Sequence, residues 1–286
     1  MLVARDYAVL VSLVTYYTLT RTQVTRLHFP TDGNGRMTRK RLGHLCALGF
    51  VARTNMQVVN PAQGQPAPVF FPTRDGVAYV AQHSGDDSWL SACSQSPNWT
   101  HLYHYTEIAD QHILIDRAAT TVGGLAIAKW YGEYSVLNPH EQEPHKRFTL
   151  FSLLSDNPRL VCKPDAGFLL GMGGFRKVYY LETDRDTTKS ADRVAAQKSN
   201  GYAGLLAQRG HLRHFPNANV EGFTVLVIAP TAKRRDALQK AFAACTGSTL
   251  YKIAAKFELT AENLFRDPVW RSNTGECVAL LKGGDA

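Results

Sequence analysis

The chain has 286 residues, of which 44% are hydrophobic and 20% are charged, so it can bury a substantial core and is not disordered as a whole. No apolar stretch is long enough to span a membrane, and the five scattered cysteines form no Cys-x-x-Cys pair, which excludes a disulfide framework and a zinc ribbon. Arg5 and Asp6 come early and no cleavage site follows, so we expect no signal peptide and a cytoplasmic protein.

Basic residues are concentrated at the start of the chain. Residues 1–60 hold eight Lys or Arg against two Asp or Glu, a balance of +6, whereas residues 61–286 contribute only +2 to the total net charge of +8. This asymmetry predicts a module that binds a polyanion near the N-terminus.

Two helices are predicted in the first thirty residues. Apolar residues at helical spacing favour a first helix over residues 5–17. Thr20 and Gln23 have the spacing of a capping box, which predicts that a short second helix begins after Thr20 and ends near His28.

A third helix, predicted over Met37–Leu48, is basic at its start. Leu42, Leu45 and Leu48 are expected to form its apolar stripe, and Gly49 is expected to end it. The basic side chains at its start are Arg36, Arg39, Lys40 and Arg41.

Two short strands are predicted next, at residues 50–54 and 69–72, on either side of a polar tip at 60–68. A basic third helix followed by such a hairpin is typical of a winged helix-turn-helix, which we place at residues 1–82. Two alternatives remain: the basic helix is only a solvated face, or the winged helix binds protein. If the module binds DNA, the residues predicted to contact it are Arg36, Thr38, Arg39, Lys40, Arg41 and Arg53.

A polar segment with little periodicity, residues 83–100, predicts a linker, and residues 101–286 form the second predicted domain. Its elements are expected in the order helix, three strands, helix, strand, helix, at residues 101–121, 126–136, 160–165, 178–182, 191–207, 223–229 and 234–244. The first six follow the α-β-β-β-α-β order of the restriction-endonuclease-like fold. The fold class expected for the whole chain is therefore mixed, α+β and α/β.

Carboxylates follow or end two of these strands. Asp165 lies in Lys163-Pro164-Asp165, and Glu182 and Asp184 are two residues apart, so on an extended backbone they point to one face. Three carboxylates gathered at one end of a sheet would repel one another unless a divalent cation lay among them. Mg²⁺ or Mn²⁺, bound by Asp165, Glu182 and Asp184, fits such hard oxygen ligands. The alternative is a solvated turn after the strand.

The chain resembles the replication-relaxation family of bacterial plasmids and integrative elements. The resemblance covers most of the chain and rests on residues 41–45 and 49–53, Pro164-Asp165-Ala166, Leu181-Glu182-Thr183-Asp184-Arg185-Asp186-Thr187, and Lys198 with Tyr202. It implies a winged helix joined to a PD-(D/E)XK nuclease-like domain. It also implies work on double-stranded plasmid or element DNA with other transfer or replication proteins, including relaxase-like nicking by some relatives.

One position departs from the nuclease pattern, because Asp184 stands where that pattern has lysine. Relatives of this fold can supply the lysine from the following helix, which assigns the role to Lys198. The resemblance also raises Tyr202 as a nucleophile in place of water, although a tyrosine near the end of a helix more often packs in the core. Glu107 and Glu133 could complete the metal shell or form salt bridges.

Two functions follow from these assignments. The leading hypothesis is a metal-dependent DNA strand-nicking protein, a relaxase or accessory nuclease, with Asp165, Glu182, Asp184 and Lys198 as catalytic residues. The alternative is a non-catalytic DNA-binding regulator or replication initiator with a degenerate nuclease domain.

Overall fold

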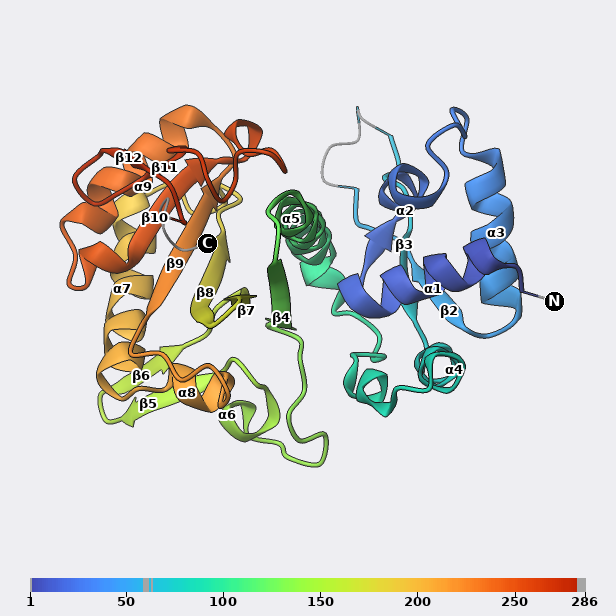
Figure 1. Ribbon diagram of the computed structural model, residues 1–286, viewed down its shortest axis with the longest axis horizontal. Helices are drawn as coiled ribbons and strands as arrows, with labels where there is room; N and C mark the ends of the chain where they lie inside the picture. Colours follow the sequence, from blue (N-terminus) through green and yellow to red (C-terminus); the bar gives the residue numbers. More distant parts are fainter. Residues whose placement is uncertain (1, 59–61, 63, 282–286) are drawn as a thin grey trace. The chain divides into compact units, whose positions relative to one another are not determined.

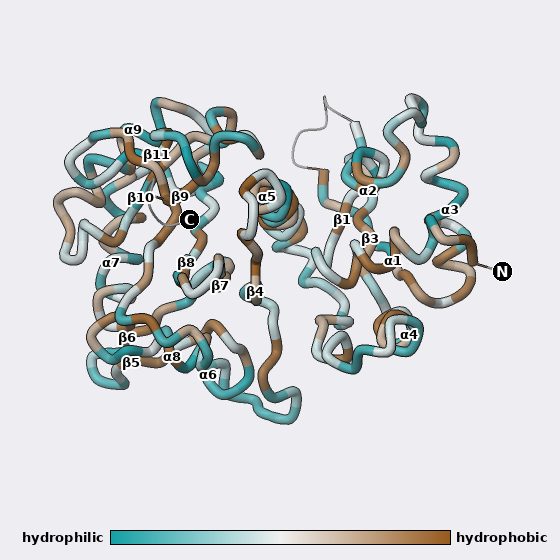
Figure 2. The backbone as a smooth tube through the Cα atoms, in the orientation of Figure 1, coloured by the Kyte–Doolittle hydropathy of each residue, from teal (hydrophilic) through white to brown (hydrophobic). Residues whose placement is uncertain are grey.

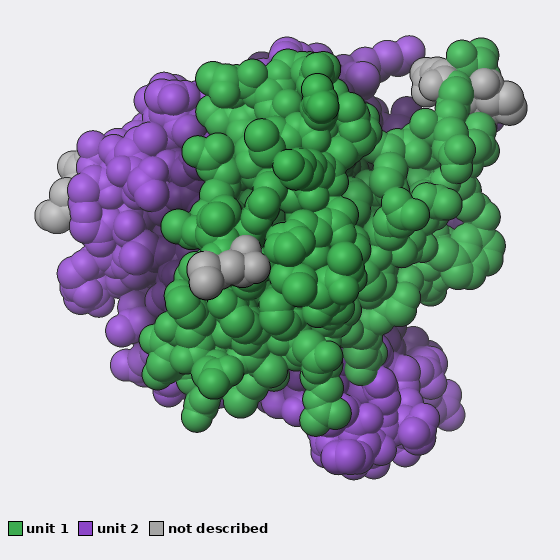
Figure 3. Space-filling view, turned by 90° about the vertical axis from the view of Figure 1, so that its right-hand side faces the viewer, with its two compact units in different colours: residues 1–113 green, residues 114–286 purple. Residues whose placement is uncertain are grey.

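The computed structural model describes residues 2–58, 62 and 64–281. The chain divides into two compact units, Met1–Ile113 and Leu114–Ala286, which Figure 3 shows in green and purple. The division lies within the long helix α5 (Leu102–Thr121), later in the chain than the linker predicted at residues 83–100.

The first unit combines helices with a small antiparallel sheet (Figure 1). Its helices are α1 (Ala4–Tyr16), α2 (Arg21–His28), α3 (Arg36–Ala47) and α4 (Arg74–Ser84), followed by the 3-10 turns η2 (Asp87–Ser91) and η3 (Trp99–His101). Its strands β1 (Leu19–Thr20), β2 (Val51–Thr54) and β3 (Val69–Pro72) pair in the order β1-β3-β2. The helices and the strand pair expected here are confirmed, while residues 60, 61 and 63 of the expected tip lie outside the described residues.

Side-chain caps fix where the helices of this unit begin. The Thr20 hydroxyl accepts a hydrogen bond from the Gln23 N–H at 3.2 Å, and the Gln23 side chain accepts one from the Thr20 N–H at 2.7 Å. This capping box confirms the predicted start of α2. Thr73 caps α4 in the same way, by accepting a hydrogen bond from the Gly76 N–H at 3.1 Å.

The apolar stripe of α3 is shorter than expected. Leu42 and Leu45 are buried in the core of the first unit, against Val9, Leu10 and Val51, among others. Leu48 is 43% exposed, so its expected place in the stripe is wrong. In an α-helix, two residues three positions apart differ by about 60° in direction around the helix axis. Position 48 therefore points about 120° away from position 42. The helix also ends at Ala47, before Gly49 at φ 77°.

The second unit is a sheet with helices packed on it. Beyond α5, its helices and turns are α6 (Pro144–Arg147), α7 (Ala191–Ala207), α8 (His211–His214), α9 (Ala232–Ala243), η4 (Ser248–Leu250) and η5 (Lys256–Glu258). Its strands are β4 (Leu125–Gly132), β5 (Ser152–Asp156), β6 (Arg159–Cys162), β7 (Ala166–Met172), β8 (Phe175–Thr183), β9 (Phe223–Ala229), β10 (Tyr251–Ala255), β11 (Trp270–Arg271) and β12 (Cys277–Val278).

Within the described residues, the strands of the second unit other than β5 and β6 form a seven-stranded mixed sheet in the order β12-β11-β10-β9-β8-β7-β4. Strands β4, β7 and β8 are antiparallel neighbours, whereas β8, β9 and β10 run parallel. Residues 225–229 of β9 are all buried, as expected for a strand covered on both faces, and Figure 2 shows its apolar character. Residues of α7 and α9 pack against Tyr180 and Val227 in one core. The expected mixed α/β fold is confirmed at this level.

One expected strand is wrong in its extent. The segment expected as a strand at 160–165 ends at Cys162, and as β6 it pairs with β5 in a separate two-stranded sheet. The glycine-containing run after it forms β7 instead, which pairs with β8 through a turn at Gly173 and Gly174. Glycine is suited to that turn because Gly173 adopts φ 56°. Asp165 therefore immediately precedes the strand beside β8.

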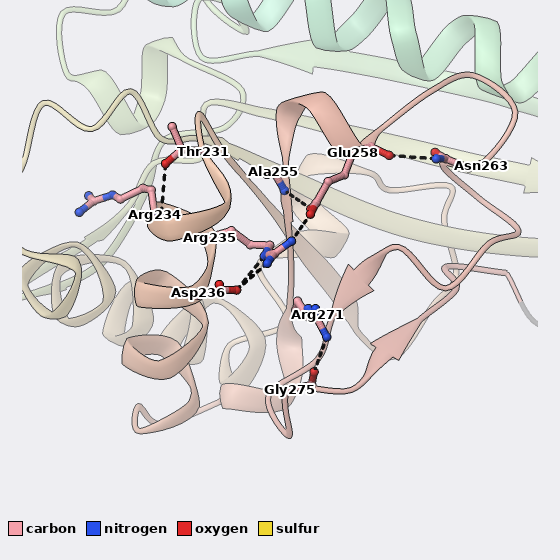
Figure 4. A network of polar contacts seen from close by, with 9 residues as sticks. All are labelled: Thr231, Arg234, Arg235, Asp236, Ala255, Glu258, Asn263, Arg271 and Gly275. Atoms are coloured by element: carbon pink, nitrogen blue, oxygen red, sulfur yellow. Dashed lines mark hydrogen bonds and ion pairs between the residues drawn. The ribbon is translucent and has the colours of Figure 1, made fainter.

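The chain after β9 is held by a polar network (Figure 4). Arg235 on α9 pairs with Glu258 and, at 2.7 Å, with Asp236. The second Glu258 oxygen accepts a hydrogen bond from the Ala255 N–H at 2.9 Å, which ties the end of β10 to η5. Trp270 on β11 is fully buried and donates its indole N–H to the Leu264 carbonyl at 2.9 Å. These contacts hold α9, η5 and β11 in place at this edge of the sheet.

Candidate functional site

Asp165 and Glu182 come from adjacent antiparallel strands. The register pairs Ala166, the first residue of β7, with Leu181 on β8. Asp165, just before Ala166, therefore lies beside Glu182, just after Leu181. One Asp165 oxygen accepts a hydrogen bond from the Thr183 N–H at 2.7 Å. The Asp165 carbonyl accepts another from the Glu133 N–H at 2.8 Å. These contacts hold the Asp165 carboxylate across the end of β8.

Lys198 reaches the same point from α7, whose first turn is capped by the Ser190 hydroxyl. Its Nζ lies 2.5 Å from Glu182 Oε2 and 3.8 Å from Asp165 Oδ1, and it donates to the Lys163 carbonyl at 3.4 Å. The Lys198 side chain is 32% exposed, whereas that of Glu182 is 7% exposed. The ammonium group therefore lies at the opening of a site whose carboxylates are largely buried.

The environment of Glu182 shifts its proton affinity upward. Burial, followed by the nearby Asp165 charge, raises the pKa of Glu182 to about 7, against the opposing effects of Lys198 and Tyr202. Burial lowers the pKa of Lys198, but the charges of Glu182 and Asp165 outweigh burial and the net shift is upward. Lys198 therefore stays protonated near neutral pH.

Tyr202 lies behind Glu182, inside the core. It is 1% exposed, and its hydroxyl donates a hydrogen bond to Glu182 Oε1 at 2.5 Å. Burial and the Glu182 charge raise the pKa of Tyr202 well above its ordinary value. A buried phenol with a raised pKa is a poor nucleophile, so the geometry makes Tyr202 a hydrogen-bond donor that orients Glu182.

Asp184 lies apart from this group. Its carboxylate accepts two hydrogen bonds from the Arg234 guanidinium, at 2.7 and 3.1 Å, and both side chains are less than 10% exposed. Two residues of strand advance the chain by about 6.6 Å, which carries Asp184 past Glu182 to a different helix, α9. Among the described residues, no group of three His, Cys, Asp or Glu side chains is placed to hold a metal ion.

Glu133 and Lys163 form a second ion pair beside Asp165. Lys163 Nζ lies 2.5 Å from Glu133 Oε2, and the Glu133 side chain is 6% exposed. Glu133 is thus engaged in a salt bridge, one of the two roles that the sequence allows. Glu107 lies on α5 in the first unit.

Only two of the three carboxylates predicted to bind a divalent cation, Asp165 and Glu182, lie together at the end of β8. Mg²⁺ is commonly bound through one or two carboxylates, with water and substrate phosphate completing its shell. Asp165 and Glu182 are the two carboxylates that lie together here, and the Lys198 ammonium now faces both of them. Asp184 would have to leave Arg234 to join them.

The basic residues of α3 fall into two groups. Arg36, Arg39 and Lys40 are exposed, as is Arg53 on β2. Arg41 pairs instead through both Nε and the terminal nitrogen with Asp6, which is fully buried. Thr38 is also buried, and its hydroxyl donates to Asp32 at 2.8 Å. Arg41 and Thr38 are therefore committed to the fold, although the sequence assigns both to DNA contact.

The replication-relaxation family matches residues 10–217 of the chain. The chain belongs to the replication-relaxation family. No curated protein and no solved structure matches it. Membership in this family indicates a role in the replication or transfer of mobile elements and an interaction with DNA.

The replication-relaxation match contains Asp165, Glu182, Lys198 and Tyr202 but ends before β9. Arg234, the partner of Asp184, therefore comes from a part of the chain outside the match. None of the helices in the described ranges is long and apolar enough to cross a membrane.

Sequence reasoning missed two residues at these sites. Arg234 has no local signal, because its partner Asp184 lies fifty positions earlier. Arg21 is the first residue of α2 and lines a pocket with Arg39 and Arg53. The basic excess of residues 1–60 is the only sequence signal that includes Arg21.

Proposed function

We propose that this protein binds double-stranded DNA of a mobile element through its first unit and nicks one strand at the Asp165–Glu182–Lys198 site. The observation that carries the proposal is the position of Lys198 Nζ, 2.5 Å from Glu182 and 3.8 Å from Asp165. A nuclease of the PD-(D/E)XK type needs two carboxylates and a lysine at the end of adjacent strands. The chain would act in the cytoplasm, where the DNA is.

The order of elements supports a restriction-endonuclease-like second unit. Helix α5 is followed by antiparallel β4, β7 and β8, then by α7 and the parallel strand β9. With α6, β5, β6 and α8 taken as insertions, this is the α-β-β-β-α-β order of that fold. In the first unit, α1, α2 and α3 are followed by the antiparallel pair β2 and β3, which supports a winged helix.

Each side chain of the site has a distinct role in the proposed reaction. Asp165 and Glu182 would hold Mg²⁺ or Mn²⁺, which supplies Lewis acidity to a phosphate oxygen and lowers the pKa of a bound water. Lys198 would place its positive charge against the negative charge that develops on the phosphate. Tyr202 would keep Glu182 oriented by its hydrogen bond. Because Tyr202 is buried, the proposed nucleophile is water.

Supercoiled plasmid carrying the element's own origin tests this function. With Mg²⁺ or Mn²⁺ the wild-type protein should convert it to the open-circular form, and EDTA should prevent the conversion. Lys198→Met should abolish nicking but keep DNA binding, because Lys198 lies in the second unit. Origin binding without nicking under any metal would instead support the non-catalytic regulator or replication initiator.

A further inference from the structure

A pocket of about 620 Å³ in the first unit is lined by three arginines from three elements. Arg21 begins α2, Arg39 lies on α3 and Arg53 lies on β2. Pro68 and Phe70 contribute an apolar wall. Arg21 also lines two neighbouring pockets, one with the 30–35 loop and one with residues 54–55 and 65–68. Arg21 thus borders all three pockets.

The arginines of this pocket have no carboxylate partner among the described residues. In the described part of the chain, no carboxylate forms an ion pair with Arg21, Arg39 or Arg53, while Arg39 donates one hydrogen bond, to the Asn34 carbonyl at 3.0 Å. A Cβ placed on Gly35 would lie 3.6 Å from both Arg21 Nε and an Arg39 terminal nitrogen, so these two guanidinium groups flank the same residue. Like charges brought together in this way favour an anion between them.

Gly43 on α3 leaves one wall of this pocket open. It lies in the middle of the helix, lines the same pocket, and has no atom within 4 Å of the place where a Cβ would be. A glycine inside a helix costs about 0.5–1 kcal/mol relative to alanine. Neither a positive φ nor internal packing requires glycine here, and the missing side chain leaves room for a ligand to approach the α3 backbone closely.

We propose that Arg21, Arg39 and Arg53 bind a phosphate group of the DNA backbone in this pocket, with Gly43 allowing the strand to approach α3. The guanidinium fork matches phosphate oxygens in geometry and charge. This inference rests on the proposed DNA-binding function and adds Arg21 as a positioning contact. The pocket sets where the duplex lies, while the exposed Arg36 and Lys40 side chains of α3 remain available to base edges or other phosphates.

Fluorescence anisotropy with a short, labelled, random-sequence duplex tests the pocket over a KCl titration. Arg21→Ala should weaken binding about tenfold and reduce the slope of log K against log salt by about 0.9, the loss of one phosphate contact. Arg21→Lys should retain the slope but bind less tightly than wild type, because lysine lacks the fork. Gly43→Gln should weaken binding by filling the pocket while leaving the melting temperature at or above that of wild type.

Arg74→Ala is the matched control, because Arg74 is an exposed arginine at the start of α4 and lines none of the three pockets. It should leave affinity and slope within about a factor of two of wild type. If wild type binds the duplex and Arg21→Ala and Gly43→Gln bind equally well, the pocket assignment is overturned and the proposed function survives. If wild type does not bind duplex DNA, the proposed function and this inference both fail.

Discussion

Arg234 donates two hydrogen bonds to Asp184 and two more to the backbone carbonyls of Thr188, at 2.7 Å, and Lys189, at 2.9 Å. A single guanidinium thus spans the segment that connects β8, which carries Glu182, to α7, which carries Lys198. The Arg234 side chain is 6% exposed, so these contacts are largely shielded from water. The bend between the two halves of the candidate site is therefore held from a third element, α9.

We expect Arg234→Ala to lower the free energy of unfolding by about 3–5 kcal/mol, because it leaves the buried Asp184 charge without its partner. Urea denaturation followed by circular dichroism measures this change. Lys233→Ala, at the exposed neighbouring position, should change stability by no more than about 0.5 kcal/mol. Equal stability of the two variants would contradict the structural role of Arg234.

Asp165 and Asp184 should respond differently to the same isosteric substitution. Asp165→Asn keeps an acceptor for the Thr183 N–H but removes a charge from the proposed ion site, so nicking should fall by about a hundredfold or more with little change in melting temperature. Asp184→Asn should lower the melting temperature through the lost ion pair with Arg234 while nicking persists at reduced temperature. Nicking assays and thermal melts on both variants separate the two roles. Loss of nicking in a fully folded Asp184→Asn protein would restore Asp184 as a ligand.

Helices and strands that depend on residues close together in the sequence were predicted correctly. The Thr20–Gln23 cap, helix α7 and strand β9 follow from capping, periodicity and apolar content, and all three are confirmed. The pairing of β6 with β5 could not be predicted, because strand partners depend on contacts between segments distant in sequence.

The candidate site shows the same limit at the level of side chains. The two-residue spacing of Glu182 and Asp184 predicted that both side chains lie on one face of the strand. Glu182 contacts α7 and Asp184 contacts α9, and these two helices pack in the same core. Which helix meets each carboxylate depends on where Lys198 and Arg234 lie after folding. Similarly, the charge run of α3 did not reveal that Arg41 is held by the buried Asp6, thirty-five positions earlier. Charge counts identify a basic segment but not which of its members face solvent.

The exposed and the internally paired arginines of α3 should be separable by salt dependence. Replacing Arg39 and Lys40 together with alanine should flatten the slope of log K against log salt by up to roughly two units. Arg41→Ala should instead destabilise the protein, because Asp6 is fully buried and would lose its partner. Anisotropy titrations and thermal melts on the same preparations check both outcomes. An unchanged slope in the double variant would mean that DNA does not contact this part of α3.

Removal of the Tyr202 hydroxyl should raise the pKa of Glu182 further. The hydrogen bond from Tyr202 stabilises the carboxylate, and burial has already raised the pKa of Glu182 to about 7. In Tyr202→Phe, the acid limb of the nicking pH profile should therefore move to higher pH. Tyr251→Phe is a suitable control, since Tyr251 is a buried tyrosine on β10 whose hydroxyl has no hydrogen-bond partner among the described residues. An unmoved acid limb would show that Glu182 does not control it.

His214 should make the fold sensitive to acid. Its ring is 1% exposed and lies between Ser152, at 2.9 Å, and the Tyr180 hydroxyl, at 2.6 Å. Burial, followed by the charge of Arg213, lowers the pKa of His214 from 6.5 to about 3. Below pH 6.5 the unfolded chain therefore binds a proton that the folded chain does not, so the stability that the neutral ring contributes is complete above that pH and is lost as pH falls toward 3.

The loss from His214 should amount to about 1.4 kcal/mol per pH unit within that window. Denaturation curves between pH 7 and 4 should show a shallower decline for His214→Gln than for wild type, even if the variant is less stable at neutral pH. His140→Gln, at an exposed position, should leave the wild-type decline unchanged. Parallel curves for wild type and His214→Gln would mean that the buried ring takes up its proton without unfolding the second unit.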